Sequence, residues 1–80
     1  MRSSASLGLR RQIIDRLVDH FGHMRLKQGE LADLLVVSRP RANALMNGHV
    51  EQFSLDALVD FAERAGLTVR LSMTRRYHTI

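Results

Sequence analysis

The chain has 80 residues, a hydrophobic content of 45%, a formal net charge of +4 and no cysteine. This length predicts one domain, the hydrophobic content argues against disorder, and the missing cysteine excludes disulfides and thiolate metal sites. No apolar run approaches the roughly 18 residues of a membrane-spanning helix. Leu7 and Leu9 are isolated among polar residues, so the start lacks a signal-peptide core. We expect a cytoplasmic prokaryotic protein.

The first residues predict one helix after a short polar start. Residues 1–6 are polar and are expected to be flexible. From Leu9 onward, apolar residues recur at helical spacing, and Gly22 is expected to end this helix in the left-handed conformation. His20 and His23 lie on either side of this glycine without an evident third ligand. We therefore expect no metal site there.

Two short helices joined by a tight turn are predicted next. The first covers residues 27–35, and Val36 and Val37 form the turn. Ser38 is suited to cap the second helix, which covers residues 39–46 and stops at Asn47-Gly48. Pro40 falls in its first turn, where a helix needs no N–H partner. Such a pair is a helix-turn-helix unit, which indicates a DNA-binding protein.

The second helix of this unit carries groups that suit DNA. Arginine pairs with guanine, asparagine pairs with adenine, and proline or alanine can touch a thymine methyl group. With Ala42 and Leu45 directed inward, the expected base contacts are Arg39, Pro40, Arg41, Asn43 and Ala44. Phosphate contacts, which set the register on DNA, are expected from Lys27, Gln28, Ser38, Asn47 and His49.

The charge distribution agrees with such a surface. No acidic residue occurs between Asp33 and Glu51, whereas Asp56, Asp60 and Glu63 cluster later in the chain. A one-sided positive field attracts phosphates and makes binding depend strongly on salt. An ordinary solvated surface rich in arginine is the alternative that charge alone leaves open.

The remaining chain predicts a helix and a strand. Ser54 caps a fourth helix, Phe53 and Leu58 are spaced as a hydrophobic staple, and Gly66 closes the helix. Apolar and polar residues then alternate, which is typical of a half-buried strand. A lone strand needs a partner, so we expect the same strand of a second copy to pair with it across a two-fold axis. The dimerisation residues are Leu67, Val69, Leu71 and Met73.

An alternative partner for this strand is the end of the same chain. Residues 75–80 could fold back as a hairpin, but this stretch has no glycine or asparagine for a tight turn. We therefore favour a homodimer. The predicted organisation is a flexible start at 1–6, a helix-turn-helix domain with its strand at 7–73, and a basic tail at 74–80.

A family resemblance extends over residues 13–73. The helix-turn-helix core, and the run NGHVEQFSLDALVDFAERAGLTVRLSM after it, resemble the lambda-repressor-like, xenobiotic-response-element (XRE) proteins, in particular short HigA-like antitoxins. The resemblance implies a mainly α domain of four to five helices with one C-terminal β-strand, which binds an operator as a dimer. In antitoxin members it also implies binding to a RelE-like toxin protein. The core positions that carry it are Gln28, Ala32, Val37, Ser38, Ala42 and Leu45.

Two positions depart from the family pattern. Val36 stands where the family has glycine, and a positive φ at a β-branched residue costs about 1–2 kcal/mol. Either the turn has another shape, or the junction is strained. Ala42 is smaller than the usual isoleucine or valine, which could let the two helices approach more closely.

The expected function is therefore transcriptional repression by a dimeric, nucleoid-associated binder of double-stranded DNA, without a cofactor. It is either an antitoxin or a free-standing regulator. The alternative from another class is a protein-interaction module of the same fold without DNA binding. An enzyme is not expected, because the four histidines are scattered and Ser38 has no evident acid or base partner nearby in the sequence.

Overall fold

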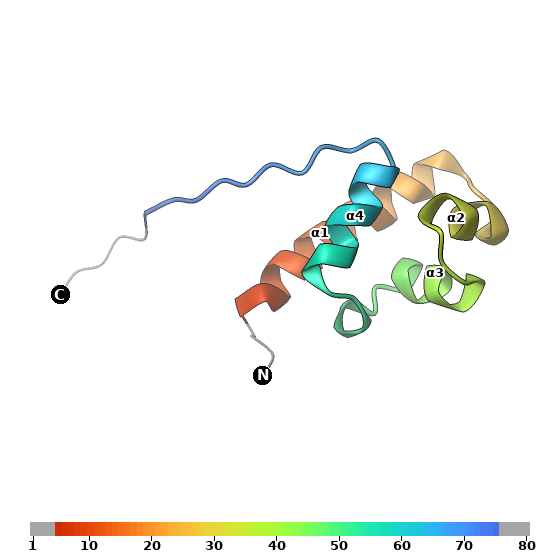
Figure 1. The fold of residues 1–80 in the computed structure, drawn as a ribbon, viewed down its shortest axis with the longest axis horizontal. Helices are drawn as coiled ribbons and strands as arrows, with labels where there is room; N and C mark the ends of the chain where they lie inside the picture. Colours follow the sequence, from red (N-terminus) through yellow and green to blue (C-terminus); the bar gives the residue numbers. More distant parts are fainter. Residues whose placement is uncertain (1–4, 76–80) are drawn as a thin grey trace.

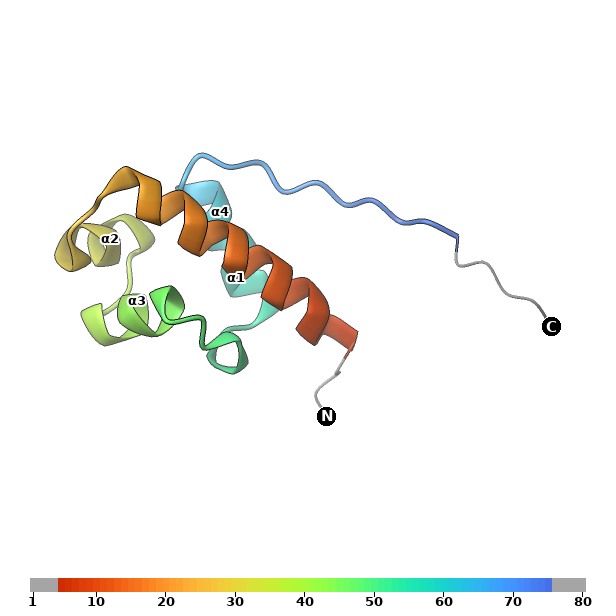
Figure 2. The same cartoon turned by 180° about the vertical axis from the view of Figure 1, so that it is seen from behind.

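The computed structural model describes residues 5–75. In Figures 1 and 2, the long α1 lies beside α4, and α2 and α3 form one end of the domain. An extended segment starts at the end of α4 near α2 and runs away from α2 and α3. Within the described residues, no helix is long and apolar enough to cross a membrane. The elements are α1 (Ala5–Met24), α2 (Gln28–Leu35), α3 (Arg39–Met46), the 3-10 helix η1 (Val50–Gln52) and α4 (Leu55–Arg64).

The limits of α1 correct two predictions from sequence. The helix already includes Ala5 and Ser6, so the flexible start does not extend to residue 6, and residues 1–4 lie outside the described part. Gly22 does not end the helix, which continues to Met24. The chain instead reverses at Arg25, whose φ is 57°, and the next residue packs against the core. Glycine permits a helix end, but the position of the next core residue decides it.

One face of each helix contributes to a single hydrophobic core. Ala42 and Leu45 of α3 are buried, as predicted, whereas Leu55 and Val59 of α4 are only half-buried. Among the described residues, no polar or charged residue is buried. The principal core residues are Ile14, Leu17, Phe21, Leu31, Leu35, Ala42, Leu45, Val50, Phe53, Leu58, Phe61 and Ala62.

The predicted caps of α3 and α4 are present. Ser38 Oγ accepts a hydrogen bond from the Arg41 N–H at 3.2 Å, and Ser54 Oγ accepts one from the Ala57 N–H at 3.1 Å. Gly66, with φ of 81°, closes α4 as expected. These caps satisfy helix-end groups that would otherwise lack partners, so they define where α3 and α4 begin and where α4 ends.

The turn between α2 and α3 keeps the family's shape, and Val36 is strained in it. Val36 has φ of 58° and ψ of 51°, which is the left-handed conformation. The Val37 N–H donates to the Ala32 carbonyl at 3.0 Å, which closes the helix end. Val37 packs against the core, whereas Val36 is 70% exposed. Val36 therefore bears the steric cost with little packing in return.

Replacing Val36 with glycine is expected to stabilise the domain. Relief of about 1–2 kcal/mol of strain outweighs the roughly 0.4–1 kcal/mol by which glycine favours the unfolded chain, so the net gain is at most about 1.6 kcal/mol. Urea denaturation of the variant measures it. Val36→Ala is the matched control, since it removes the branched side chain but keeps Cβ. Equal stabilisation by both variants would contradict the assignment of strain to Cβ.

The predicted strand is not formed in the single chain. Among the described residues there is no strand, and residues 67–75 have no regular structure, so the described fold is all-helical. Val69, Leu71 and Met73 are exposed. A strand requires a ladder partner, and the described chain supplies none for this segment. Residues 76–80, part of the alternative hairpin, lie outside the described residues, and the homodimer stays a prediction.

Candidate nucleic-acid interface

The outer face of α3 is the centre of the candidate interface. Ala42 and Leu45 are fully buried, which turns the opposite side of the helix outward. Arg39, Pro40, Arg41 and Asn43 are exposed, as predicted. Ala44 is only 8% exposed, so its expected outward orientation is wrong. The chain after α3 folds back there, and the His49 N–H donates to the Ala44 carbonyl at 3.1 Å.

A side-chain hydrogen bond joins the two helices across this face. Gln28 at the start of α2 donates from Nε2 to Oδ1 of Asn43 on α3, at 2.8 Å. The Asn43 amide nitrogen and a second lone pair on its oxygen are left for another partner. These are the groups with which asparagine recognises adenine. Gln28, predicted as a phosphate contact, therefore orients a predicted base contact.

Arg39 lies directly over the backbone of α2. A Cβ atom added at Gly29 would lie 2.7 Å from one terminal nitrogen of Arg39 and 3.2 Å from Cζ. The absence of a side chain at Gly29 thus provides the space in which this guanidinium rests. Gly29 lies in the first turn of α2, where a glycine is a weak helix former. Nothing in the local pattern indicates its contact with a residue on the next helix.

Replacing Gly29 with alanine tests this contact. Alanine favours a helix by up to about 1 kcal/mol over glycine, so the free energy of unfolding is expected to stay equal or rise slightly. The displaced guanidinium is expected to lower affinity for a preferred DNA site several-fold, as measured by fluorescence anisotropy. Asp33→Ala, an exposed change elsewhere on α2, is the control. Unchanged DNA affinity in the Gly29 variant would show that this position of Arg39 is irrelevant to binding.

Arg41 is held differently from the other predicted base contacts. Its guanidinium lies over the ring of Phe53, 4.4 Å from the centroid, and Nη1 donates to the Gln52 carbonyl at 3.3 Å. Both contacts draw the side chain toward the segment between α3 and α4. Cation–π and carbonyl contacts leave part of the guanidinium free for an anion. This position suits a phosphate better than a base edge.

Sequence reasoning missed a second arginine that supports the same segment. Arg10 of α1 is half-buried, and its Nη1 lies 3.3 Å from the Phe53 carbonyl and 3.5 Å from the Val50 carbonyl. Arg10 and Arg41 thus approach η1 from two helices and bind carbonyls at its start and at its end. No local pattern marked Arg10, because it resembles the exposed Arg11 and Arg16 of the same helix.

The predicted phosphate contacts all lie on exposed positions around α2 and α3. Lys27 precedes α2, and its N–H donates to Oε1 of Glu30 at 2.8 Å. Ser38 is used as a cap, but its backbone remains at the free helix start. Asn47 follows α3, and Nδ1 of His49 is 3.2 Å from Nε2 of Gln52. With Gln28, they lie at or next to the ends of α2 and α3.

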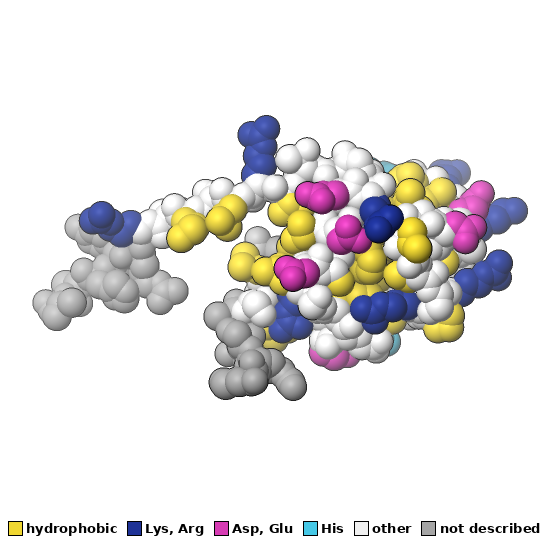
Figure 3. All heavy atoms as spheres, viewed as in Figure 1, with side chains coloured by type: hydrophobic (Ala, Val, Ile, Leu, Met, Phe, Trp, Pro, Cys, Tyr) yellow, Lys and Arg dark blue, Asp and Glu magenta, His cyan; other side chains and the backbone are white. Residues whose placement is uncertain are grey.

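The acidic side chains of the later chain lie away from α3, as the sequence predicts. Figure 3 shows acidic side chains gathered over α4, which carries Asp56, Asp60 and Glu63. Basic side chains project at the end formed by α2 and α3, next to acidic ones of that end. The exposed side of α3 itself has arginines and no acid. An anion approaching α3 therefore meets cations and neutral polar groups first.

The described residues contain no group of three or more histidine, cysteine, aspartate or glutamate side chains placed to hold a metal ion. His23 is paired within α1, where its Nδ1 lies 2.8 Å from the Asp19 carbonyl. The exposed groups of α2 and α3 can donate and accept hydrogen bonds and attract phosphates, which are binding functions.

The comparisons with known proteins agree with this geometry. A family model described as a helix-turn-helix domain matches residues 1–74, nearly the whole chain. The comparison with curated proteins gives no match. Helix-turn-helix domains place their second helix in the major groove of DNA. In this chain, that helix is α3.

Proposed function

Since this chain belongs to the helix-turn-helix domain family, we propose that it is a sequence-specific binder of double-stranded DNA that represses transcription by occupying an operator. In this proposal, α3 enters the major groove and the start of α2 lies against the DNA backbone. The observation that carries the proposal is the Gln28–Asn43 hydrogen bond of 2.8 Å, which holds an asparagine amide on the exposed side of α3.

The proposed roles of the side chains follow from their positions. Arg39 and Asn43 read base edges, and Pro40 touches an apolar base group. Arg41, held over Phe53, binds a phosphate instead. Ala44 has no role in binding. The remaining phosphate contacts, which set the register, are Lys27, Gln28, Ser38, Asn47 and His49.

Dimerisation completes the proposal. Two copies place two α3 helices in successive major grooves, so the half-sites are expected about 34–36 Å apart, or a multiple of this distance. The extended segment after α4, with Leu67, Val69, Leu71 and Met73, supplies the contact between copies. Leu71 and Met73 are 77% and 83% exposed, and such apolar side chains favour a protein partner.

Selection of bound sites from a random duplex pool tests the proposal. The expected product is an inverted repeat with fixed spacing, and affinity is expected to fall steeply as salt is raised. Binding to random duplex DNA at low salt is measured in parallel. A chain that shows neither enrichment nor low-salt affinity would be an interaction module of this fold without DNA binding.

The antitoxin role is a finer proposal, which rests on the resemblance to HigA-like proteins. An antitoxin additionally binds a toxin, here expected to be RelE-like. Co-expression of the chain with the product of the neighbouring gene tests this role. Neutralised toxicity and a co-purified complex would support it, whereas DNA binding without either outcome would indicate a free-standing regulator.

A further inference from the structure

The segment after α4 has an amphipathic, extended backbone without partners. Apolar side chains occur at every second position from Leu67 to Met73, and none of the backbone hydrogen bonds in the described chain involves residues 68–75. In Figure 3, the hydrophobic side chains of this segment lie along one edge and a basic side chain projects from the other. Unpaired strand-like backbone with an apolar edge favours pairing with another extended chain.

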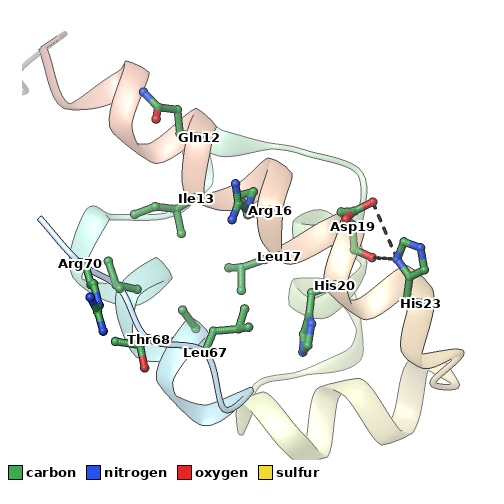
Figure 4. A pocket seen from close by; sticks show the side chains of 12 residues that line it. Gln12, Ile13, Arg16, Leu17, Asp19, His20, His23, Leu67, Thr68 and Arg70 are labelled. Carbon is green, nitrogen blue, oxygen red and sulfur yellow. Dashed lines mark hydrogen bonds and ion pairs between the residues drawn. The ribbon is translucent and has the colours of Figure 1, made fainter. Parts of the chain in front are cut away.

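A groove lies beside the root of this segment. It has a volume of about 550 Å³ and lies between α1 and residues 67–70. Figure 4 shows Leu17 and Leu67 pointing toward one another across it, with Arg16, His20 and Arg70 toward its rim. Ile13 and Val69 extend its apolar lining. An apolar side chain from outside would be shielded from water in this groove.

We propose that residues 67–75 of two copies pair antiparallel in one register, with Leu71 opposite Leu71 and Val69 opposite Met73. Met73 of the second copy then lies beside Val69 and covers the groove along α1. The inference rests on the homodimer of the proposed function and deepens it, because it specifies which residues meet. The occupant of the groove is thus a second copy of this chain.

Charge selects this register over its neighbour. Directly opposed residues in antiparallel strands share a face, so only registers that pair odd-numbered with odd-numbered positions keep the apolar side chains together. A shift that centres the pair on Arg70 opposes two arginines directly, which destabilises a sheet. Centring on Leu71 opposes Arg70 with Ser72 instead.

The other two registers place Met73 or Arg75 less favourably. Centring on Val69 pairs only residues 67–71 and places Met73 opposite Ala65, at the closed end of α4. Centring on Ser72 brings Arg75 opposite Val69 at the groove and moves it away from the end of α4. Centring on Leu71 pairs Leu71 with Leu71 and Val69 with Met73 and places Arg75 beside the end of α4.

The proposed register also matches opposite charges between copies. Arg75 falls opposite Leu67, next to the last turn of α4. Glu63 in that turn is exposed and has no ion-pair partner in the described chain, whereas Asp60 is paired with Arg64 at 2.9 Å. The arginine at the end of one segment therefore approaches the acidic end of α4 of the other copy. This complementarity favours a second copy over a basic partner.

Single-cysteine variants test the register, because the chain has no cysteine of its own. Leu71→Cys is expected to form a disulfide-linked dimer readily, since opposed Cβ atoms lie about 4.5–5.5 Å apart and only a small adjustment closes the bond. Arg70→Cys is expected to link at least several-fold more slowly. Val69→Cys mixed with Met73→Cys should give a cross-linked heterodimer faster than either variant gives a homodimer.

A charge at the groove gives a second readout. Met73→Asp is expected to raise the dissociation constant of the dimer at least tenfold in sedimentation, whereas the control Thr74→Asp, on the opposite face of the segment, leaves it within about twofold. Both positions are exposed, so neither change threatens the fold.

Two outcomes would overturn the inference. Faster cross-linking through Arg70→Cys than through Leu71→Cys would assign another register, and equal dissociation of the two aspartate variants would show that the groove is not covered by Met73. The proposed function is tested separately by DNA selection. A protein that enriches operator sites yet fails these tests would bind DNA with a different dimer contact.

Discussion

Replacing Phe53 with alanine is expected to lower the free energy of unfolding by about 3–5 kcal/mol, which is a large fraction of the roughly 4–12 kcal/mol expected for a domain of this size. Phe53 is almost fully buried, and its ring meets Phe61 edge-on with centroids 5.9 Å apart. Arg41 covers the ring and Arg10 binds its carbonyl. Loss of the ring therefore leaves a cavity and releases the segment between α3 and α4.

Urea denaturation followed by circular dichroism measures this effect. Phe53→Leu is the control, since it keeps much of the apolar volume and should lose clearly less stability. The leucine variant should nevertheless bind DNA more weakly if the ring positions Arg41 for a phosphate. A Phe53→Ala protein that unfolds at nearly the parental urea concentration would show that the core does not depend on this ring.

The largest expected effect on binding comes from Asn43. Its replacement with alanine should weaken binding to the selected operator by about 1–3 kcal/mol, or about 5- to 150-fold, and relax the preference at one base pair. The reason is the loss of both amide groups that read a base edge. Competition of the variant against single-base operator substitutions measures the loss and locates it. Parental affinity and specificity in the variant would refute the role.

Gln28→Ala distinguishes two possible roles of Gln28. If Gln28 only binds a phosphate, affinity falls equally for all operator variants, which is the expectation from sequence. If the 2.8 Å bond orients Asn43, specificity at the same base pair relaxes as well. The Gln28→Ala, Asn43→Ala double variant should then lose less than the sum of the single losses. Additive losses would show that the two residues act independently.

Local patterns in the sequence determined most of the fold. Helical spacing of apolar residues, Ser38 and Ser54 as caps, and Gly66 as a helix end are signals that act within a few residues, and the structure confirms them. The helix-turn-helix unit followed from the same signals. The predicted helix end at Gly22 was wrong, because glycine tolerates a helix end without requiring one. The position of the next core residue, which decides where the helix ends, is not part of the local pattern around Gly22.

Only the tertiary structure decided which side chains of that unit are available. Ala44 is covered by the chain that follows α3, Gln28 meets Asn43, and Arg39 lies over Gly29. These contacts join residues on different elements, and helical periodicity specifies a face of one helix but not what packs near its edge. The sequence by itself therefore determined the elements and their order. The packing of α2, α3 and η1 against one another decided which groups face outward, because orientation depends on contacts between distant residues.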